Sequence, residues 1–418
     1  MMPDRAYVLR LAALVGAALA VVATVNIAVD PFDVWRVVHV ARLNDVKTPH
    51  ASWEVISKIA GLRAVKPRAI ILGSSRARLA MDPQSPIWRA GHGPAYNAGV
   101  PGGAIGDIRQ LFGLAVRLAP VKVALVELHF HGFDVNAAHL EMNLKPDDPR
   151  LRAAGAVDLL PRLILADSLR ESWETLRRYS SAADRSEFFQ RLDGKIEFHA
   201  EAFDAPLTLA GHERYLLEVW LRGDADRSFC LRNRRTGANS LAELDALLTQ
   251  AREHGVQVKL ILAPVHARQL ALMWAAGLRP QFEHWKREMV RMVADRQSSD
   301  PASAPELWDF TRYSEITTEG FSRVAAGQRP NAYFWEPIHY KDNVGTMILD
   351  AVSRNPHPTY PLPPDFGLLL TLDNVEAQLA SERAGHEAYR QSHLDEMAQL
   401  DRLVADANAK AGGARLCK

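Results

Sequence analysis

The chain has 418 residues, of which 48% are hydrophobic and 24% are charged, a composition that excludes a disordered, collagenous or multi-span membrane protein. Lys and Arg number 50 and Asp and Glu number 49, so the net charge of +1 gives no sign of a nucleic-acid partner. The two cysteines, Cys230 and Cys417, exclude a disulfide-rich scaffold and a cysteine-based zinc module. They can pair in an oxidising compartment. The length allows two to three domains, or one large α/β domain with extensions.

The N-terminus contains an apolar run. Residues 11–29 carry no charge and are numerous enough to cross a bilayer as a helix. Arg5 and Arg10 precede the run, so the positive-inside rule leaves the N-terminus in the cytoplasm. A cleaved signal peptide with a small-residue site at Ala18–Ala20 is the alternative. Because the run continues past that site, we expect an uncleaved anchor over residues 1–30. Either way the bulk of the chain is exported, and we predict a single-pass protein of a bacterial inner membrane whose bulk is periplasmic.

The middle of the chain alternates short apolar segments with helical patterns. Three segments have the pattern of buried strands: Arg68–Leu72, Val121–Leu128 and Val256–Ala263. The clearest helix is Ser240–His254, which carries leucines on one face and opens with a capping box formed by its first residue and Glu243. This alternation predicts an α/β fold with a parallel sheet covered by helices on both faces.

We assign the α/β domain to residues 65–355. It contains an insert at 140–237 with no recognisable motif, which we expect to shape specificity as a cap or subdomain. Active sites in such folds lie at the carboxyl ends of the strands, so the segments that follow each strand are the candidates for function.

Those segments carry residues suited to acyl transfer. Ser75 follows the first strand, Gly102 lies in a glycine-rich turn, and Glu336 and His339 stand in a late loop. A serine nucleophile needs a base within hydrogen-bond reach, and a carboxylate orients that base. The backbone N–H groups of Ser75 and Gly102 can hold an oxyanion. The plainer interpretation of the Gly-Ser-Ser turn is a helix N-cap.

Three segments, in this order, resemble blocks I, II and V of the SGNH (GDSL-type) hydrolase superfamily. They are Gly73–Ser75, Asn97–Gly102 and Glu336–His339. The closer resemblance is to membrane-anchored, exported bacterial members related to the O-acetyltransferases that modify exopolysaccharides such as alginate. It covers residues 65–350 and is carried by these further segments: Gly73–Arg76, Pro264–His266, Phe282–Lys286, Leu307–Phe310 and Trp335–Tyr340.

The resemblance implies a three-layer, flavodoxin-like fold and assigns roles to single residues. Ser75 becomes the nucleophile and His339 the general base. Glu336 stands where the family has Asp, and Ser74 replaces the Asp of the first block. In the third block His129 occupies the position of the Asn that completes the oxyanion hole, so we expect His129 to join Ser75 in that role.

The activity implied is that of an acyl esterase or O-acyltransferase without a cofactor. An acyl group, in the simplest case acetyl, passes through Ser75 to water or to a carbohydrate hydroxyl. A membrane-bound acyl-donor protein is a further implied partner. We assign Arg76, Trp335 and Tyr340 to substrate binding, although the two aromatic residues are equally suited to core packing.

Two other functions stay open. The first is a catalytically degenerate SGNH-fold scaffold that binds glycan or envelope partners. The second is a metal-dependent hydrolase, because His129 and His131 lie two apart at a strand end and point to one face, with Asp134 and His266 as further ligands. The plainer interpretation is that these side chains bond to the backbone.

The C-terminus begins with a proline-rich segment, predicted to be a linker over residues 356–371. Residues 372–410 lack proline and carry one apolar stripe, which predicts a long helix. The stripe either packs on its own domain or contacts a partner.

Overall fold

The computed structural model describes residues 5–40, 44–47, 53–89, 91, 93–136, 166–180, 188–198, 205–221, 228–301, 304–320, 331–364 and 366–412. The chain divides into two compact units. Unit 1 comprises Met1–Lys66 and Pro146–Ala202, and unit 2 comprises Pro67–Lys145 and Phe203–Lys418. The predicted insert at 140–237 is therefore divided, because its stretch Pro146–Ala202 groups with the N-terminal segment and the rest belongs to unit 2.

Unit 1 holds the apolar N-terminal helix α1 and a small antiparallel sheet in the order β1-β5-β6. α1 is long and apolar enough to cross a membrane, a property it shares with signal sequences. The elements of the unit are α1 (Arg5–Val29), β1 (Val46–Lys47), α2 (Glu54–Val65), α7 (Ala166–Ser180), β5 (Phe188–Arg191) and β6 (Ile196–Phe198).

The last turns of α1 belong to the folded unit. Asn26 is buried, and its side-chain oxygen accepts a hydrogen bond from Ser172 Oγ at 2.8 Å. Lys47 Nζ donates to the carbonyl of Val29 at 2.7 Å, which satisfies one of the carbonyl groups left open at a helix end. These contacts lie beyond Ala18–Ala20, so the end of the apolar run is part of the folded protein.

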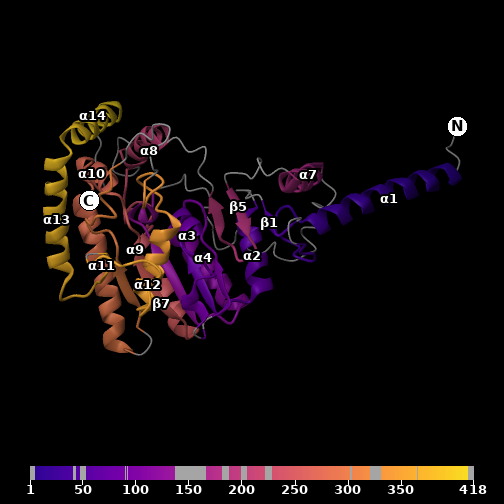
Figure 1. Cartoon of the computed structure of the whole chain (residues 1–418), viewed down its shortest axis with the longest axis horizontal. Coiled ribbons are helices and arrows are strands. Elements are labelled where there is room, and N and C mark those ends of the chain that lie inside the picture. Colours follow the sequence, from indigo (N-terminus) through magenta and orange to yellow (C-terminus); the bar gives the residue numbers. More distant parts are fainter. Residues whose placement is uncertain are drawn as a thin grey trace. The chain divides into compact units, whose positions relative to one another are not determined.

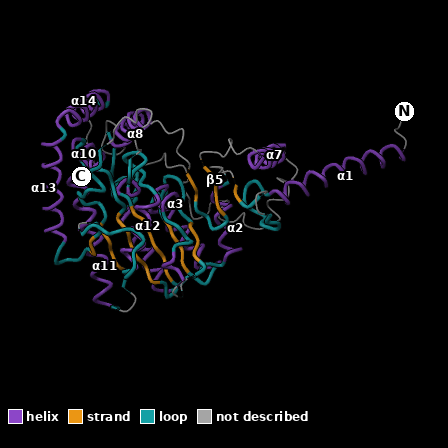
Figure 2. Tube along the Cα trace, in the orientation of Figure 1, coloured by secondary structure: helices purple, strands orange, loops and turns teal. Residues whose placement is uncertain are grey.

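Unit 2 is built on a β-sheet surrounded by helices (Figures 1 and 2). The sheet has six strands in the order β3-β2-β4-β7-β8-β9. The first five strands are parallel, and β9 pairs antiparallel at the edge. β2 is the first strand of this sheet along the chain, yet it lies between β3 and β4, which is the doubly wound order of flavodoxin-like folds. The crevice in such sheets opens beside the carboxyl ends of β2 and β4. The strands are β2 (Ala69–Leu72), β3 (Ala95–Asn97), β4 (Val123–Leu128), β7 (Gln257–Leu262), β8 (Glu306–Asp309) and β9 (Leu368–Leu369).

Helices cover both faces of this sheet, as expected. Ile71 of β2 lies in a buried cluster with Ile348 of α12, so α3 and α12 cover one face. α12 crosses α3 so closely that a side chain at Gly345 would meet the backbone of Ala80. α4 and α9 contribute nothing to that cluster but contact β2, β7 and each other, which places them on the other face. The helices are α3 (Ser75–Ala80), α4 (Ile105–Leu118), α8 (Ala205–Trp220), α9 (Ser240–Glu253), α10 (Ala267–Ala275), α11 (Arg279–Ser299) and α12 (Asp342–Ser353), with short 3₁₀ turns η1 (Pro86–Arg89) and η2 (Phe130–Phe133).

The start of α9 differs from the prediction. Asn239 is the N-cap, and its side chain accepts from the N–H of Leu241 at 3.2 Å. Ser240 Oγ instead donates to the carbonyl of Leu231, and Glu243 pairs with Arg109 of α4. The predicted capping box of Ser240 and Glu243 does not form, because Asn, which also caps well, stands one residue earlier in extended conformation.

The C-terminal segment also differs from the prediction. The predicted linker contains β9, which pairs with the open edge of β8. The predicted single helix is two helices, α13 (Val375–Ser392) and α14 (Leu394–Lys410), separated by the non-helical backbone of His393. Leu379, Met397 and Leu400 are buried, and the two helices contact α8, α10 and α11 (Figure 1). The apolar stripe therefore packs on its own unit.

Candidate active site

Ser75 stands at the carboxyl end of β2, on the turn that starts α3. Ser74 is the N-cap of this helix, and its side chain accepts from the N–H of Arg76. Gly73 has φ +153°, and a Cβ there would come within 2.5 Å of Glu127 Oε2, so the turn requires glycine. The N-cap interpretation holds for Ser74, and it leaves Ser75 as the first residue of the helix.

His339 stands on a tight turn closed by an isolated β-bridge between Phe334 and Tyr340. Within this turn the carboxylate of Glu336 accepts from the N–H groups of Ile338 (2.8 Å) and His339 (3.0 Å). These two hydrogen bonds stabilise the turn on which His339 stands. They require Glu336 to lie three residues before His339, which explains the spacing.

These three side chains meet in a relay. Ser75 Oγ lies 2.8 Å from His339 Nε2, across 264 positions of sequence. His339 Nδ1 bonds Glu336 Oε1, which puts the ring proton on Nδ1 and leaves Nε2 to accept from the serine hydroxyl. Glu336 is fully buried. Burial opposes its ionisation, but the charge of His339, the nearby His212 and the hydrogen bonds of His339 and Ile338 prevail and hold the pKa of Glu336 well below its usual range. The carboxylate therefore stays ionised, as the orienting acid of a relay must.

A second buried carboxylate holds the nucleophile turn. Glu127, at the end of β4, accepts through Oε2 from the N–H of Ser74 at 2.7 Å and from its Oγ at 2.9 Å. Burial raises the pKa of Glu127, while the charge of Arg76 and the bonds from Ser74 oppose that rise. Arg76 is also buried, and its Nε donates to the carbonyl of Ile338 at 2.7 Å, which links the nucleophile helix to the turn of the base. Arg76 therefore has a structural contact besides its predicted role in substrate binding.

Sequence reasoning did not single out Glu127. The signal was present, because a carboxylate is the penultimate residue of the otherwise apolar strand Val123–Leu128. A charge there needs a local reason, since a buried carboxylate without partners is costly.

The relay opens into a cavity of about 310 Å³. Ser75, His339, Gly102 and His129 all line it, so the predicted oxyanion residues are gathered around the nucleophile. Its other side is the apolar face of α8, a helix of the predicted insert. The full lining is Ser74, Ser75, Arg76, Pro101, Gly102, His129, His131, Asp134, Tyr215, Leu216, Val219, Trp220, Ile338 and His339.

His129 is neutral in this setting. Burial, reinforced by the charge of Arg76, holds the pKa of His129 well below its usual range. Its Nδ1 lies 3.9 Å from Glu127 Oε1, too far for a hydrogen bond, and neither atom has another partner in the part of the chain that the structure describes. A neutral imidazole carries one N–H, so His129 can donate one hydrogen bond into the cavity.

No protein-family model matches this sequence, and no curated protein gives a significant match. The resemblance to SGNH hydrolases therefore rests on short sequence motifs alone.

Three of the four predicted metal ligands, His131, Asp134 and His266, are already hydrogen-bonded within the protein. Trp220 Nε1 donates to His131 Nδ1 at 3.1 Å, and the side-chain amide of Gln269 lies against His131 Nε2 at 2.8 Å. His266 accepts from the N–H of Arg268 and contacts the carbonyl of Glu319 at 2.6 Å. Burial lowers the pKa of both His131 and His266 to about 3.

Asp134 likewise accepts from the N–H of Asn136 and of Cys230, both at 3.0 Å. Across the described residues no three His, Cys, Asp or Glu side chains are arranged to hold a metal. Asp134 and His266 thus bond backbone groups, as the plainer interpretation predicts, whereas His131 bonds two side chains.

Trp335 and Tyr340, predicted to bind substrate, are not part of the cavity lining. Tyr340 is fully buried in the core cluster beside α12. Trp335 lies under Lys341, whose Nζ is 4.5 Å from the ring centroid. Of the three residues assigned to substrate binding, only Arg76 reaches the cavity.

His212, on α8, is the functional candidate that sequence reasoning missed. Its Nδ1 lies 3.6 Å from Oε2 of Glu336, the oxygen that does not bind His339. The carboxylate raises the pKa of His212 despite partial burial. No sequence signal could find this residue, because it lies in the insert, 124 positions before Glu336 (336 − 212), and in no motif.

Proposed function

We propose that this protein is a serine-dependent acyl esterase or O-acyltransferase, tethered to the membrane by α1 and exported. The observation that carries the proposal is the Ser75–His339 contact of 2.8 Å, with Glu336 behind the ring and a cavity in front of it. Serine, histidine and carboxylate in this order are the parts of a nucleophilic relay.

The chemistry proceeds in two steps. Ser75 Oγ attacks the carbonyl carbon of an acyl donor while His339 Nε2 takes the hydroxyl proton, and the proton then passes to the departing group. An acceptor O–H next attacks the acyl-enzyme and gives its proton to His339. The bond from the acyl carbon to Ser75 Oγ then breaks, and His339 returns the proton to Oγ, which regenerates the serine. The developing oxyanion is held by the N–H groups of Ser75 and Gly102 and by His129.

The choice of substrate rests on the resemblance. Polysaccharide O-acetyltransferases of this type move acetyl groups onto sugar hydroxyls, so we infer an acetyl donor and a carbohydrate acceptor, with water as the acceptor of an esterase. A membrane-bound protein is the inferred source of the acyl group. The cavity of about 310 Å³ is large enough for an acetyl group and part of one sugar ring.

The inferred location agrees with the state of Cys230, which is disulfide-bonded. Structural disulfides are typical of exported proteins. Cys417, the other cysteine of the sequence, lies outside the described residues.

Covalent labelling tests the proposal. The full-length protein in detergent is treated with a fluorescent fluorophosphonate, and the adduct is located by mass spectrometry. We expect labelling of Ser75, its loss in Ser75→Ala, and its persistence in EDTA. A folded wild-type protein without an adduct on Ser75 would refute the proposal and favour a non-catalytic scaffold. Loss of activity in EDTA would favour the metal-dependent alternative.

A second assay separates transfer from hydrolysis. Acetate release from p-nitrophenyl acetate is compared with and without an oligosaccharide acceptor, and acetylated sugar is measured by mass spectrometry. Acetylated product from the wild type but not from Ser75→Ala identifies a transferase. Acetate alone identifies an esterase.

A further inference from the structure

Five exposed apolar side chains gather beside the end of α1. Outside α1, Val37, Val38, Val40, Leu169 and Trp173 are the large hydrophobic residues of unit 1 that are exposed in the described structure, at 67%, 37%, 43%, 39% and 65%. The much larger unit 2 exposes only four in its described part, Tyr215, Tyr360, Leu372 and Leu394. The group of five, which we name the apolar collar, is therefore a local concentration that needs an explanation.

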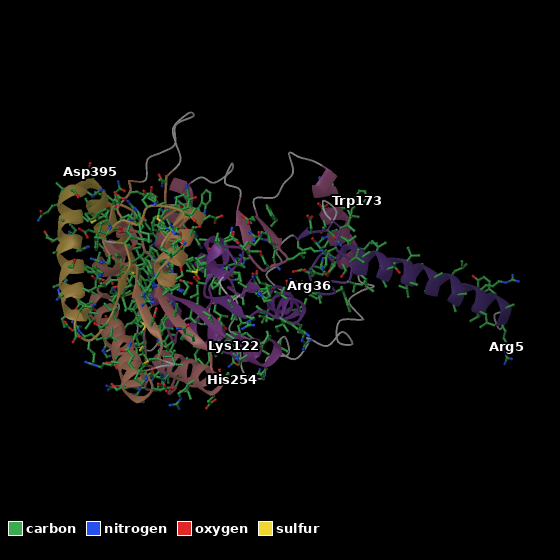
Figure 3. All side chains as sticks on the ribbon, turned by 60° about the horizontal axis from the view of Figure 1, so that its bottom comes forward. Arg5, Arg36, Lys122, Trp173, His254 and Asp395 are labelled. Carbon is green, nitrogen blue, oxygen red and sulfur yellow. The ribbon has the colours of Figure 1, made fainter. Side chains whose placement is uncertain are left out.

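α7 has its polar and apolar faces exchanged relative to a helix in water. Ser168, Ser172 and Thr175 are buried, whereas Leu169 and Trp173 are exposed. Figure 3 labels Trp173 on this helix. A helix on a water-soluble core buries its apolar stripe. An outward-facing Trp and Leu on a helix that contacts α1 indicate apolar surroundings on that side.

Hydrogen bonds place the collar level with the outer end of α1. Ser172 of α7 bonds Asn26, one turn before the helix ends. Asn44 Nδ2 donates both to the carbonyl of Ala28 at 2.6 Å and to that of Val38 at 2.7 Å, so Val38 lies beside the last turn. Residues 11–29 span about 28 Å as a helix, which matches the hydrocarbon core of a bilayer. Asn26 and Ala28 then lie at the boundary between hydrocarbon and headgroups, where Trp is enriched.

The charges of α7 balance, so they provide no net attraction to an anionic surface. The helix carries three acidic and three basic residues. Arg170 bonds Glu171 at 3.1 Å, and Arg177 bonds Glu174 at 3.0 Å. Apolar burial, rather than attraction to anionic lipid, is the force available, so zwitterionic lipid suffices.

We propose that the apolar collar inserts into the interfacial layer of the bilayer that α1 crosses. The inference rests on the proposed role of α1 as a retained anchor. Unit 1 is then held to the membrane at two places, by the helix and by the collar, which fixes its tilt instead of leaving it on a free tether.

Depth-dependent quenching tests this. Trp173→Cys and Val38→Cys are each labelled with the fluorophore NBD without reductant, so that the disulfide of Cys230 stays closed. The full-length chain is placed in phosphatidylcholine nanodiscs that carry a doxyl quencher at acyl carbon 5 or 12. Leu19→Cys, near the middle of the apolar run, reports whether α1 spans the bilayer. Leu394→Cys, exposed at 71% on unit 2, supplies the baseline.

We expect the labels at positions 173 and 38 to be quenched about twofold more by the shallow quencher than by the deep one, as interfacial groups are. The label at position 19 should show the reverse order. If position 19 is quenched while 173 and 38 stay at the baseline, the collar proposal is wrong and the anchor stands. If position 19 also stays at the baseline, both the anchor and the collar are wrong.

Discussion

Oε2 of Glu336 faces Nδ1 of His212 at 3.6 Å, while Oε1 of the same carboxylate bonds His339. The acid of the relay is thus flanked by two imidazoles from distant parts of the chain. His212 is carried by α8, the helix that also forms the apolar wall of the cavity. The helix of the insert is therefore linked electrostatically to the relay as well as packed over it.

Substitution of His212 should change stability in a pH-dependent way. The carboxylate of Glu336 raises the pKa of His212 in the folded state. A histidine whose pKa is raised by folding stabilises the folded state when it is protonated. This stabilisation is fully present below the ordinary histidine pKa of about 6.5, and it is lost as the pH rises through the raised pKa of the folded state. His212→Gln should therefore lower the Tm relative to wild type at pH 5.5 and leave it nearly equal at pH 8.5.

Thermal unfolding in detergent at the two pH values measures this difference. The control is His254→Gln, whose side chain is exposed and contacts only a local carbonyl, and which should show no pH-dependent difference. An equal Tm loss at both pH values in His212→Gln would contradict the electrostatic role.

Substitution of Glu336 should disable the relay while preserving the fold. Glu336→Gln keeps one side-chain oxygen that can accept from the N–H of His339, but it places an NH2 group where Oε2 accepted from Ile338 and removes the charge that steadies a protonated His339. We expect the rate constant of fluorophosphonate labelling to fall on the order of 10³- to 10⁴-fold. Glu315→Gln, an exposed carboxyl in unit 2, is the control and should label normally. Labelling of a folded Glu336→Gln variant within about tenfold of wild type would show that the carboxylate does not serve the relay.

Glu127 and Arg76 should be energetically coupled. Glu127→Gln leaves the buried guanidinium without its main compensating charge, and Arg76→Met does the same to the carboxylate. We expect each single variant to lower the free energy of unfolding, because it leaves a buried charge without its opposite charge. The double variant should lose less than the sum, with a coupling of about 1 to 3 kcal/mol. Urea unfolding of the four proteins completes the cycle, and strictly additive losses would show that the two charges are independent.

The buried Lys286 should be needed to keep α13 packed against α11. Lys286 of α11 is fully buried, and its Nζ bonds Asp309 (2.7 Å), Thr311 (2.5 Å) and Glu382 of α13. Lys286→Met leaves two buried carboxylates uncompensated, so we expect a loss of about 3 to 5 kcal/mol.

The next residue supplies the control for that variant. Arg287 pairs with Glu376 on the surface, and Arg287→Met should have only a small effect. Chemical unfolding measures both, and amide exchange shows whether α13 loses protection. Equally small losses in the two variants would contradict the proposed role of Lys286.

The sequence by itself determined the features that depend on near neighbours. The uncharged run predicts α1, and apolar strands followed by helical patterns predict a parallel sheet. The turn that carries Glu336 and His339 can be predicted from the sequence, because the carboxylate of Glu336 accepts from N–H groups only two and three residues ahead. Gly73 can likewise be predicted as a turn residue, because its positive φ is a property of its own backbone that favours glycine.

Only the tertiary structure decided which distant residues meet. The 2.8 Å contact between Ser75 and His339, the approach of His212 to Glu336 and the link from Glu127 to Ser74 all follow from strand order and helix packing. The same holds for β9, which pairs because β8 leaves an open edge. A local pattern records which residues prefer to be buried or paired, but it does not specify their partners, because those are selected by the three-dimensional packing of the whole unit.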